Sequence, residues 1–191
     1  MFVRPIDRSH PPVVRRGLTL VEVMVALTVL TVSVYLLSST ITTVMMHGES
    51  KRERTIAVDA VMNQIEVMRS QKFEDLLALY NADIFDDPGT PGSAPGVGFA
   101  VFGLDPVEGD ADGLPGRVWM PSQTAQLMEN VNLPELSMPR DLDGNLRVDT
   151  QDHAEDYIVL PVRVQVEWSG RGGDRSFEMS TMFAKLKKLE M

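Results

Sequence analysis

The feature that most limits how this chain can fold is an apolar run at residues 18–46. The only ionisable side chains in these 29 residues are Glu22 and Tyr35. A helix needs roughly 20 predominantly apolar residues to cross the hydrocarbon core of a bilayer, so the run is long enough to do so. We therefore predict one membrane-spanning helix, because a buried helix of a soluble protein is rarely so long and so uniformly apolar.

Charged residues beside the run predict its orientation. The first 17 residues hold four arginines and one aspartate, and Arg15 and Arg16 directly precede the run. The positive-inside rule then leaves the N-terminus cytoplasmic and carries the remainder to the periplasm. Three basic side chains after the run are a mild opposing signal, offset in part by two acidic ones: Lys51, Arg52 and Arg54 against Glu49 and Glu53. A cleaved secretory signal fits less well, because its apolar core is shorter and ends in small residues.

Glu22 is the costly member of the run. It follows Leu18 by about 6 Å along a helix axis, and insertion scales assign about 2.5–3.5 kcal/mol to such a charge at the centre of a membrane. One interpretation is that the carboxylate reaches the interface without a partner. The other is that it pairs with a cation at the same depth, and cleavage of the chain just before Leu18 would create one.

The heptapeptide GLTLVEV, residues 17–23, resembles the class III signal of type IV prepilins and pseudopilins. In that family a short basic leader ends in glycine, followed by a hydrophobic residue, Thr or Ser, two apolar residues and glutamate. The resemblance implies that prepilin peptidase cuts between Gly17 and Leu18 and that the new amine of Leu18 is N-methylated. It also implies that Glu22 pairs with the N-terminal amine of a neighbouring subunit.

The resemblance extends over residues 15–46 and has two departures from the commonest pattern. Leu18 stands where the family most often has phenylalanine. No proline occurs between Pro12 and Pro88, whereas many major pilins have a proline that kinks this helix. The second departure favours a minor pilin or pseudopilin over a major pilin.

We predict four regions: a leader at 1–17, a transmembrane and filament-core helix at 18–46, an extramembrane half of the same helix at 47–82, and a globular periplasmic β-rich domain at 83–191. The helix should continue to about Tyr80, because Ala57, Val61, Ile65 and Met68 recur at three-to-four spacing and form an apolar stripe. The predicted fold class is α+β and pilin-like, with this N-terminal helix packed on a C-terminal antiparallel sheet.

The sheet signals lie mainly at the end of the chain. Residues 157–168 alternate valines and Trp168 with polar residues, and residues 175–186 return with Phe177 and Phe183 on one face, which predicts a long hairpin. Pro161 marks an edge position or a bulge in it. Residues 83–139 hold eight of the twelve prolines, which predicts loops around short strands at 97–103 and 117–121. Residues 122–130 suggest a short helix with Ser122 near its start.

One loop has the residue types of a metal site. Residues 141–152, DLDGNLRVDTQD, place oxygen-bearing side chains at positions 1, 3, 5, 9 and 12: Asp141, Asp143, Asn145, Asp149 and Asp152. Calcium prefers six to eight such oxygen ligands at this kind of spacing. However, glycine stands at position 4 and not at position 6, where an EF-hand loop needs it. Calcium binding and an ordinary solvated turn both remain open.

Composition bears on which functions the chain can have. The net charge is −9, and residues 83–156 hold fifteen acidic side chains against three arginines, so no nucleic-acid partner is predicted. Cysteine is absent, and the three histidines (His10, His47 and His153) lie apart from any catalytic motif. We therefore expect no enzyme activity and no required cofactor.

The preferred interpretation is a structural subunit, a minor pilin or pseudopilin of a type IV pilus or a type II secretion-like filament. Its predicted partners are prepilin peptidase, other pilin or pseudopilin subunits and the inner membrane, which it crosses once before it joins the filament. The alternative is a single-pass, membrane-anchored periplasmic module that binds calcium or a protein and is not incorporated in a filament.

Overall fold

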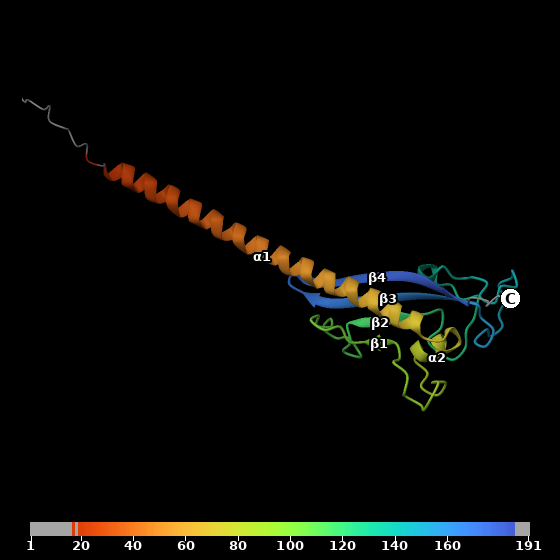
Figure 1. Cartoon of the computed structure of the whole chain (residues 1–191). Helices are drawn as coiled ribbons and strands as arrows, with labels where there is room; N and C mark the ends of the chain where they lie inside the picture. The colour runs from red at the N-terminus through yellow and green to blue at the C-terminus, as the bar shows by residue number, and fades with distance from the viewer. Residues whose placement is uncertain (1–16, 18, 186–191) are drawn as a thin grey trace, which may run out of the picture. The chain divides into compact units, whose positions relative to one another are not determined.

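The structure is a computed structural model that describes residue 17 and residues 19–185. Helix α1 spans Leu20–Ser70 and is followed by short helical turns and four strands (Figure 1). The described chain divides into two compact units between Met45 and Met46. The first holds the N-terminal half of α1, and the second holds everything that follows.

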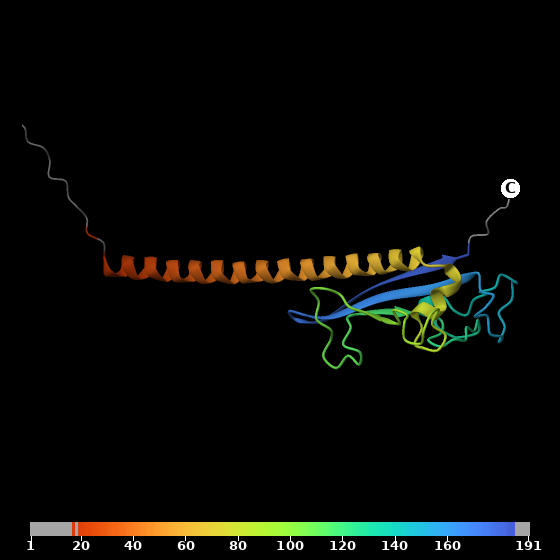
Figure 2. The same ribbon diagram turned by 60° about the horizontal axis from the view of Figure 1, so that its bottom comes forward.

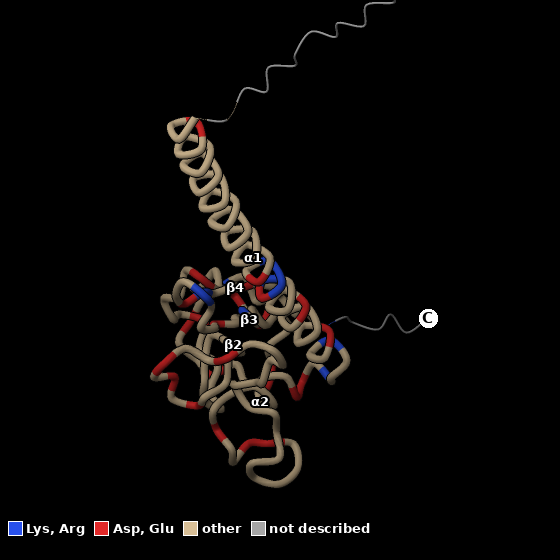
Figure 3. Tube along the Cα trace, turned by 90° about the vertical axis from the view of Figure 1, so that its left-hand side faces the viewer, with Lys and Arg blue, Asp and Glu red and all other residues tan. Residues whose placement is uncertain are grey.

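The N-terminal half of α1 exposes its apolar side chains over residues 20–45. None of the residues in its most apolar window is buried, and the mean hydropathy of that window is 2.3. Most of its hydroxyl groups donate within the helix: for example, Thr28 Oγ1 donates to the Met24 carbonyl (2.8 Å) and Ser33 Oγ to the Val29 carbonyl (2.7 Å). Figure 3 shows how few charges this half carries. Such a helix meets the requirement of a bilayer that backbone polar groups find partners internally, and the predicted helix at this position is confirmed.

The C-terminal half of α1 belongs to the second unit and buries the predicted stripe. Ala57, Val61, Ile65 and Met68 are all buried in one core with the inward side chains of the sheet. Figures 1 and 2 show this half lying along the β3–β4 hairpin. A Cβ at Gly170 would lie 2.8 Å from Glu53 Oε2, so the Glu53 side chain would have to shift to accommodate it.

The helix is shorter than the sequence suggests, because α1 ends at Ser70 and not near Tyr80. After an extended Lys72, the 3-10 turn η1 (Phe73–Asp75) and the short helix α2 (Leu76–Tyr80) change the direction of the chain. The hydroxyl of Tyr157 donates to the Phe73 carbonyl (2.8 Å) at this point. The break allows Leu76, Leu77 and Tyr80 to be buried in the core, and this burial outweighs the local preference to continue the helix.

The sheet is antiparallel with the order β1-β2-β3-β4. The predicted hairpin is confirmed as β3 (Val159–Gly170) and β4 (Gly173–Ala184), joined at Arg171 and Gly172. Val162, Val164, Val166 and Trp168 are all buried, as their alternation requires. Pro161 pairs only with Met182 of β4, beyond the part of β3 that pairs with β2, so it has the edge position that a strand proline needs. The predicted α+β, pilin-like fold class is therefore correct.

The short strands are only partly as predicted. Strand β2 (Gly116–Trp119) overlaps the prediction at 117–121, but β1 is limited to Gly98–Phe99 within the predicted 97–103. The predicted helix at 122–130 is wrong. The Leu127 amide donates to Asp152 Oδ1 (2.8 Å), and the His153 amide donates to the Leu127 carbonyl (2.8 Å). Long-range partners thus take the backbone groups that a local helix would have used. The 3-10 turn η2 (Pro134–Leu136) follows.

Candidate functional site

The N-terminal candidate site begins with the residue that caps α1. Thr19 precedes the first helical residue, and its Oγ1 accepts a hydrogen bond from the Glu22 amide (3.2 Å). The Thr19 carbonyl accepts from the Val23 amide (3.2 Å), which is the first bond of the helix. Threonine at the N-cap with glutamate three residues later is the sequence pattern of a capping box. The TLVE segment therefore defines where the helix starts.

Glu22 consequently lies in the first turn of α1. An acidic group there interacts favourably with the positive end of the helix dipole, which reduces but does not remove the cost of its charge in a membrane. Gly17 and Glu22 are exposed. The predicted cleavage and methylation position, Leu18, lies outside the described residues.

The second candidate site is organised by a buried carboxylate that the metal prediction did not include. The Glu129 side chain is fully buried. Its Oε1 accepts from the amides of Leu142 (2.5 Å) and Asp143 (3.3 Å), and its Oε2 accepts from the Asp149 amide (3.2 Å). Three backbone donors satisfy the charge in place of water. Glu129 thereby fixes both ends of the acidic loop 141–149.

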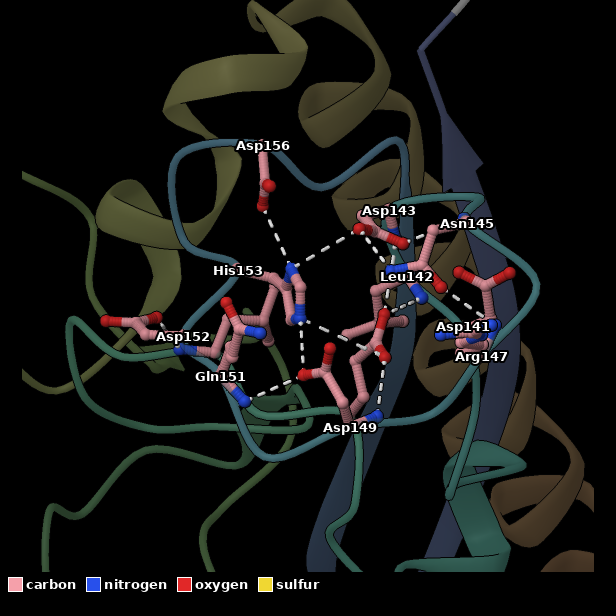
Figure 4. Close-up of polar contacts among 12 residues, drawn as sticks. Asp141, Leu142, Asp143, Asn145, Arg147, Asp149, Gln151, Asp152, His153 and Asp156 are labelled. Carbon is pink, nitrogen blue, oxygen red and sulfur yellow. Dashed lines mark hydrogen bonds and ion pairs between the residues drawn. The ribbon is translucent and has the colours of Figure 1, made fainter.

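His153 lies among the acidic side chains and is also buried (Figure 4). Its Nε2 lies 3.1 Å from Asp149 Oδ1 and its Nδ1 lies 3.0 Å from Asp156 Oδ1. Asp143 and Glu129 lie at 3.8 and 3.9 Å. Burial lowers the pKa of His153, but the hydrogen bonds that Asp149 and Asp156 accept and the charge of Glu129 raise it more, so the net shift is upward. The surrounding carboxylates thus favour the protonated form of the imidazole over the neutral one.

The N-terminal part of the loop is a self-contained turn. Asp141 accepts from the amides of Gly144 and Leu146, each at 2.7 Å, and Asp143 accepts from the Asn145 amide at 2.9 Å. Desolvation raises the pKa of Asp141, but the backbone hydrogen bonds outweigh it and lower the pKa overall. Leu146 has a positive φ of 68° and a side chain that is 91% exposed.

The structure brings together three of the five predicted metal ligands and adds three residues to them. Ligand atoms within 4.8 Å of one another occur in three groups: Glu129 with Asp149 and His153; Asp143 with His153 and Asp156; and Glu129 with Asp141 and Asp143. Among the acidic and histidine side chains of the described residues that form these groups, Asp152 is absent. Asn145 Oδ1 accepts from the Arg147 amide (2.8 Å). Asp152 accepts from the Leu127 and Ala154 amides and turns away from the other carboxylates (Figure 4).

Only the group of Glu129, Asp141 and Asp143 consists entirely of oxygen ligands. The other two groups include the imidazole of His153, which is a poor ligand for calcium but an ordinary one for transition metals. The donor types of the first group therefore suit calcium, and those of the other two groups do not.

Sequence reasoning missed Glu129 and gave His153 no role. Glu129 stands alone in a proline-rich segment, and its burial depends on a strand-like bridge between Met128 and Asp152. His153 stands among acidic residues, which was a usable signal. No spacing rule would have connected either residue to Asp141 or Asp149.

Comparison with known protein families gives one finding. The model described as the prokaryotic N-terminal methylation motif matches residues 14–34. The match contains Gly17, the Thr19 cap and Glu22, together with the first turns of α1. No curated protein and no solved structure matches the chain significantly.

Proposed function

Residues 14–34 carry the prokaryotic N-terminal methylation motif, which supports a type IV pilin-like or pseudopilin-type substrate of prepilin peptidase, and from this premise we propose that the chain is a minor pilin or pseudopilin. It is a structural subunit of a type IV pilus or a type II secretion-like filament. The peptidase cuts between Gly17 and Leu18, and the amine of Leu18 is methylated. The subunit waits in the inner membrane with its folded unit in the periplasm, and then enters the filament.

The observation that carries this proposal is the coincidence of the motif with the start of an exposed apolar helix. The motif ends at residue 34 inside a helix whose most apolar window has no side chain buried by the described residues. Such a surface needs either lipid or other apolar helices around it. A filament core of bundled helices supplies the second environment after the membrane has supplied the first.

Glu22 gives the proposed assembly its register. Cleavage before Leu18 would place a cationic amine one residue before the Thr19 cap. In a low-dielectric bundle an unpaired carboxylate is expensive, whereas a carboxylate paired with a neighbour's amine is tolerated. The pairing thus favours one axial position of each subunit relative to the next.

Filament incorporation of Glu22 variants tests this assembly step. We expect Glu22→Gln to leave cleavage after Gly17 largely intact and to reduce incorporation at least tenfold, measured by immunoblot of sheared filaments. Glu66→Gln changes the charge of an exposed position in the same helix and serves as the matched control. Thr19→Val removes the cap hydroxyl without changing any charge, so it reports on helix capping alone.

If Glu22 acted only within its own helix, Thr19→Val and Glu22→Gln would impair incorporation to a similar extent. Normal incorporation of Glu22→Gln would exclude the pairing altogether.

The alternative is a membrane-anchored binding module that never enters a filament. It is favoured only by the acidic loop, where the Glu129, Asp141 and Asp143 carboxylates gather within 4.8 Å of one another. Calcium bound there would crosslink the loop to the core. Thermal melting of the full chain with calcium and with a chelator tests this: we expect a higher Tm with calcium, lost in Asp141→Asn and retained in Glu155→Gln. Equal melting temperatures with calcium and with the chelator would mean that the loop does not bind calcium.

A further inference from the structure

We propose that a basic cavity at the start of the second unit binds the phosphate headgroup of an anionic phospholipid. The proposal depends on insertion of the chain in a membrane and not on its incorporation in a filament. The cavity has a volume of about 650 Å³, within the ordinary range of small-ligand sites. It lies between α1 and the hairpin end of the sheet.

One face of α1 forms the first wall of the cavity. His47, Ser50, Lys51 and Arg54 line it, and their spacing of three, four and seven residues places them on one side of a helix. Arg52 also follows the apolar segment and is exposed, but it does not line the cavity. The helix therefore presents two cations and a hydroxyl to one space and directs a third cation elsewhere.

The sheet supplies an apolar wall and a neutralised cation. Trp168 of β3 and Phe177 of β4 line the cavity beside Arg175. Arg175 Nη1 pairs with Glu53 Oε2 (3.2 Å), and Trp168 Nε1 donates to the same oxygen (3.3 Å). An aromatic wall beside cationic groups suits a ligand whose charged head continues into an acyl chain.

The charge balance leaves two cations available. Glu53 is held by Arg175, and Glu49 is held by Arg171 (2.8 Å). Among the described residues, Lys51 and Arg54 have no carboxylate within ion-pair distance. The cavity thus carries net positive charge that the protein itself does not balance, and a monoanionic phosphate would complement it.

The position along the chain favours a lipid as the source of that phosphate. Lys51 follows Met46, the last residue of the apolar run, by five residues, or about 7.5 Å of helix at 1.5 Å per residue. The headgroup region of a bilayer is about 5–8 Å thick on each side of the hydrocarbon core. Lys51 therefore reaches the outer edge of the headgroup region when the apolar run spans the core, and Arg54, at about 12 Å from Met46, reaches it only through its long side chain, which can snorkel back.

These cations also oppose the orientation of the chain. The positive-inside rule disfavours Lys and Arg just beyond the exported end of a membrane segment. Two basic side chains that face one cavity at this position therefore disfavour export of the second unit. Binding of a lipid phosphate would explain why they stand there.

Native mass spectrometry of the full chain in detergent, with phosphatidylglycerol added, tests the proposal. We expect one phosphatidylglycerol molecule to be retained, and Lys51→Gln/Arg54→Gln to weaken its binding by about tenfold or more. Arg52→Gln, which removes a cation from the same helix but outside the cavity, should change binding less than twofold. Thermal melting establishes that each variant remains folded.

Three results would overturn the proposal. Equal losses in Arg52→Gln and in the double variant would mean diffuse attraction and no cavity site. Equal retention of phosphatidylcholine, or displacement of the lipid by millimolar inorganic phosphate, would mean that no anionic lipid is selected. Unchanged lipid retention, with reduced association between full-length chains in the double variant, would assign the cavity to an acidic segment of a neighbouring subunit.

Discussion

The two halves of α1 differ in what they contact, although they belong to one helix. Over residues 20–45 the apolar side chains are exposed on every side, and Leu30 is 58% exposed. Over residues 46–70 the apolar side chains form a stripe, and Met68 is fully buried. The sheet of the same chain covers the apolar stripe of the second half. No described residue covers the first half, so its apolar surface requires lipid or other apolar helices around it.

This difference shows how one helix can serve two purposes. Hydrophobic residues at three-to-four spacing indicate a helix that packs on its own domain. Uniform hydrophobicity indicates a helix that needs lipid or other apolar helices on all sides. The transition falls between Met45 and Met46, shortly before Glu49, where charged residues recur in α1 after Glu22 (Figure 3).

The largest effect on the second half should come from Met68→Ala. We expect a loss of about 2–5 kcal/mol in the free energy of unfolding, because a fully buried methionine leaves a cavity. Met62→Ala, on the exposed side of the same helix at 52% exposure, is the matched control and should cost less than about 0.5 kcal/mol. Denaturant unfolding of the full chain measures both values. Similar losses in the two variants would mean that the stripe does not support the fold.

A charge in the first half should impair membrane insertion and leave the stability of the second unit unchanged. Leu30→Glu should disfavour membrane insertion by about 2.5–3.5 kcal/mol and leave the unfolding midpoint of the second unit unchanged. Leu30→Val is its control. The membrane-integrated fraction after alkaline extraction measures the first effect. The comparison between the two halves fails if Leu30→Glu destabilises the folded unit as much as Met68→Ala does.

Glu129→Gln tests whether the acidic loop depends on the core. The amide retains one acceptor but loses the charge that three backbone donors stabilise, so we expect a loss of about 1–3 kcal/mol. Glu155→Gln changes an exposed acid of the same region and should be neutral. Hydrogen exchange at the Leu142 and Asp149 amides should accelerate in Glu129→Gln alone. Unchanged exchange at both amides would contradict the role given to Glu129.

The smallest expected effect concerns Tyr157, which fixes the chain just after α1 ends. Tyr157→Phe should cost about 0.5–1.5 kcal/mol, the value of one hydrogen bond. Burial raises the pKa of Tyr157 to about 12. Since the unfolded chain has the lower pKa, the stability due to Tyr157 is complete below about pH 10 and is lost as the pH rises to about 12. The wild type should therefore lose more stability than Tyr157→Phe across this range, and parallel losses would refute the assignment.

Local sequence patterns predicted the parts of the fold that local physics determines. The apolar run gave the first half of α1, and the alternation from Val162 to Trp168 gave β3. The helix end at Ser70 and the irregular backbone at 122–130 depend on distant partners, namely the Tyr157 hydroxyl and Asp152. No window of neighbouring residues contains that information.

The two candidate sites also differ in how far consecutive residues could predict them. The segment from Gly17 to Glu22 was readable because its requirements are consecutive in the chain, and the matched motif covers it. The roles of Gly17, Leu18 and Glu22 remain predictions. The acidic loop was only partly readable, because Glu129 reaches it from a segment more than ten residues away.

The mass of the mature N-terminus tests the central claim most directly. Intact-protein and N-terminal peptide mass spectrometry of the chain, isolated from a host that contains prepilin peptidase, should give a first residue of Leu18 with one added methyl group. A chain that retains Met1 and its leader would contradict the proposed processing and leave a simple membrane anchor.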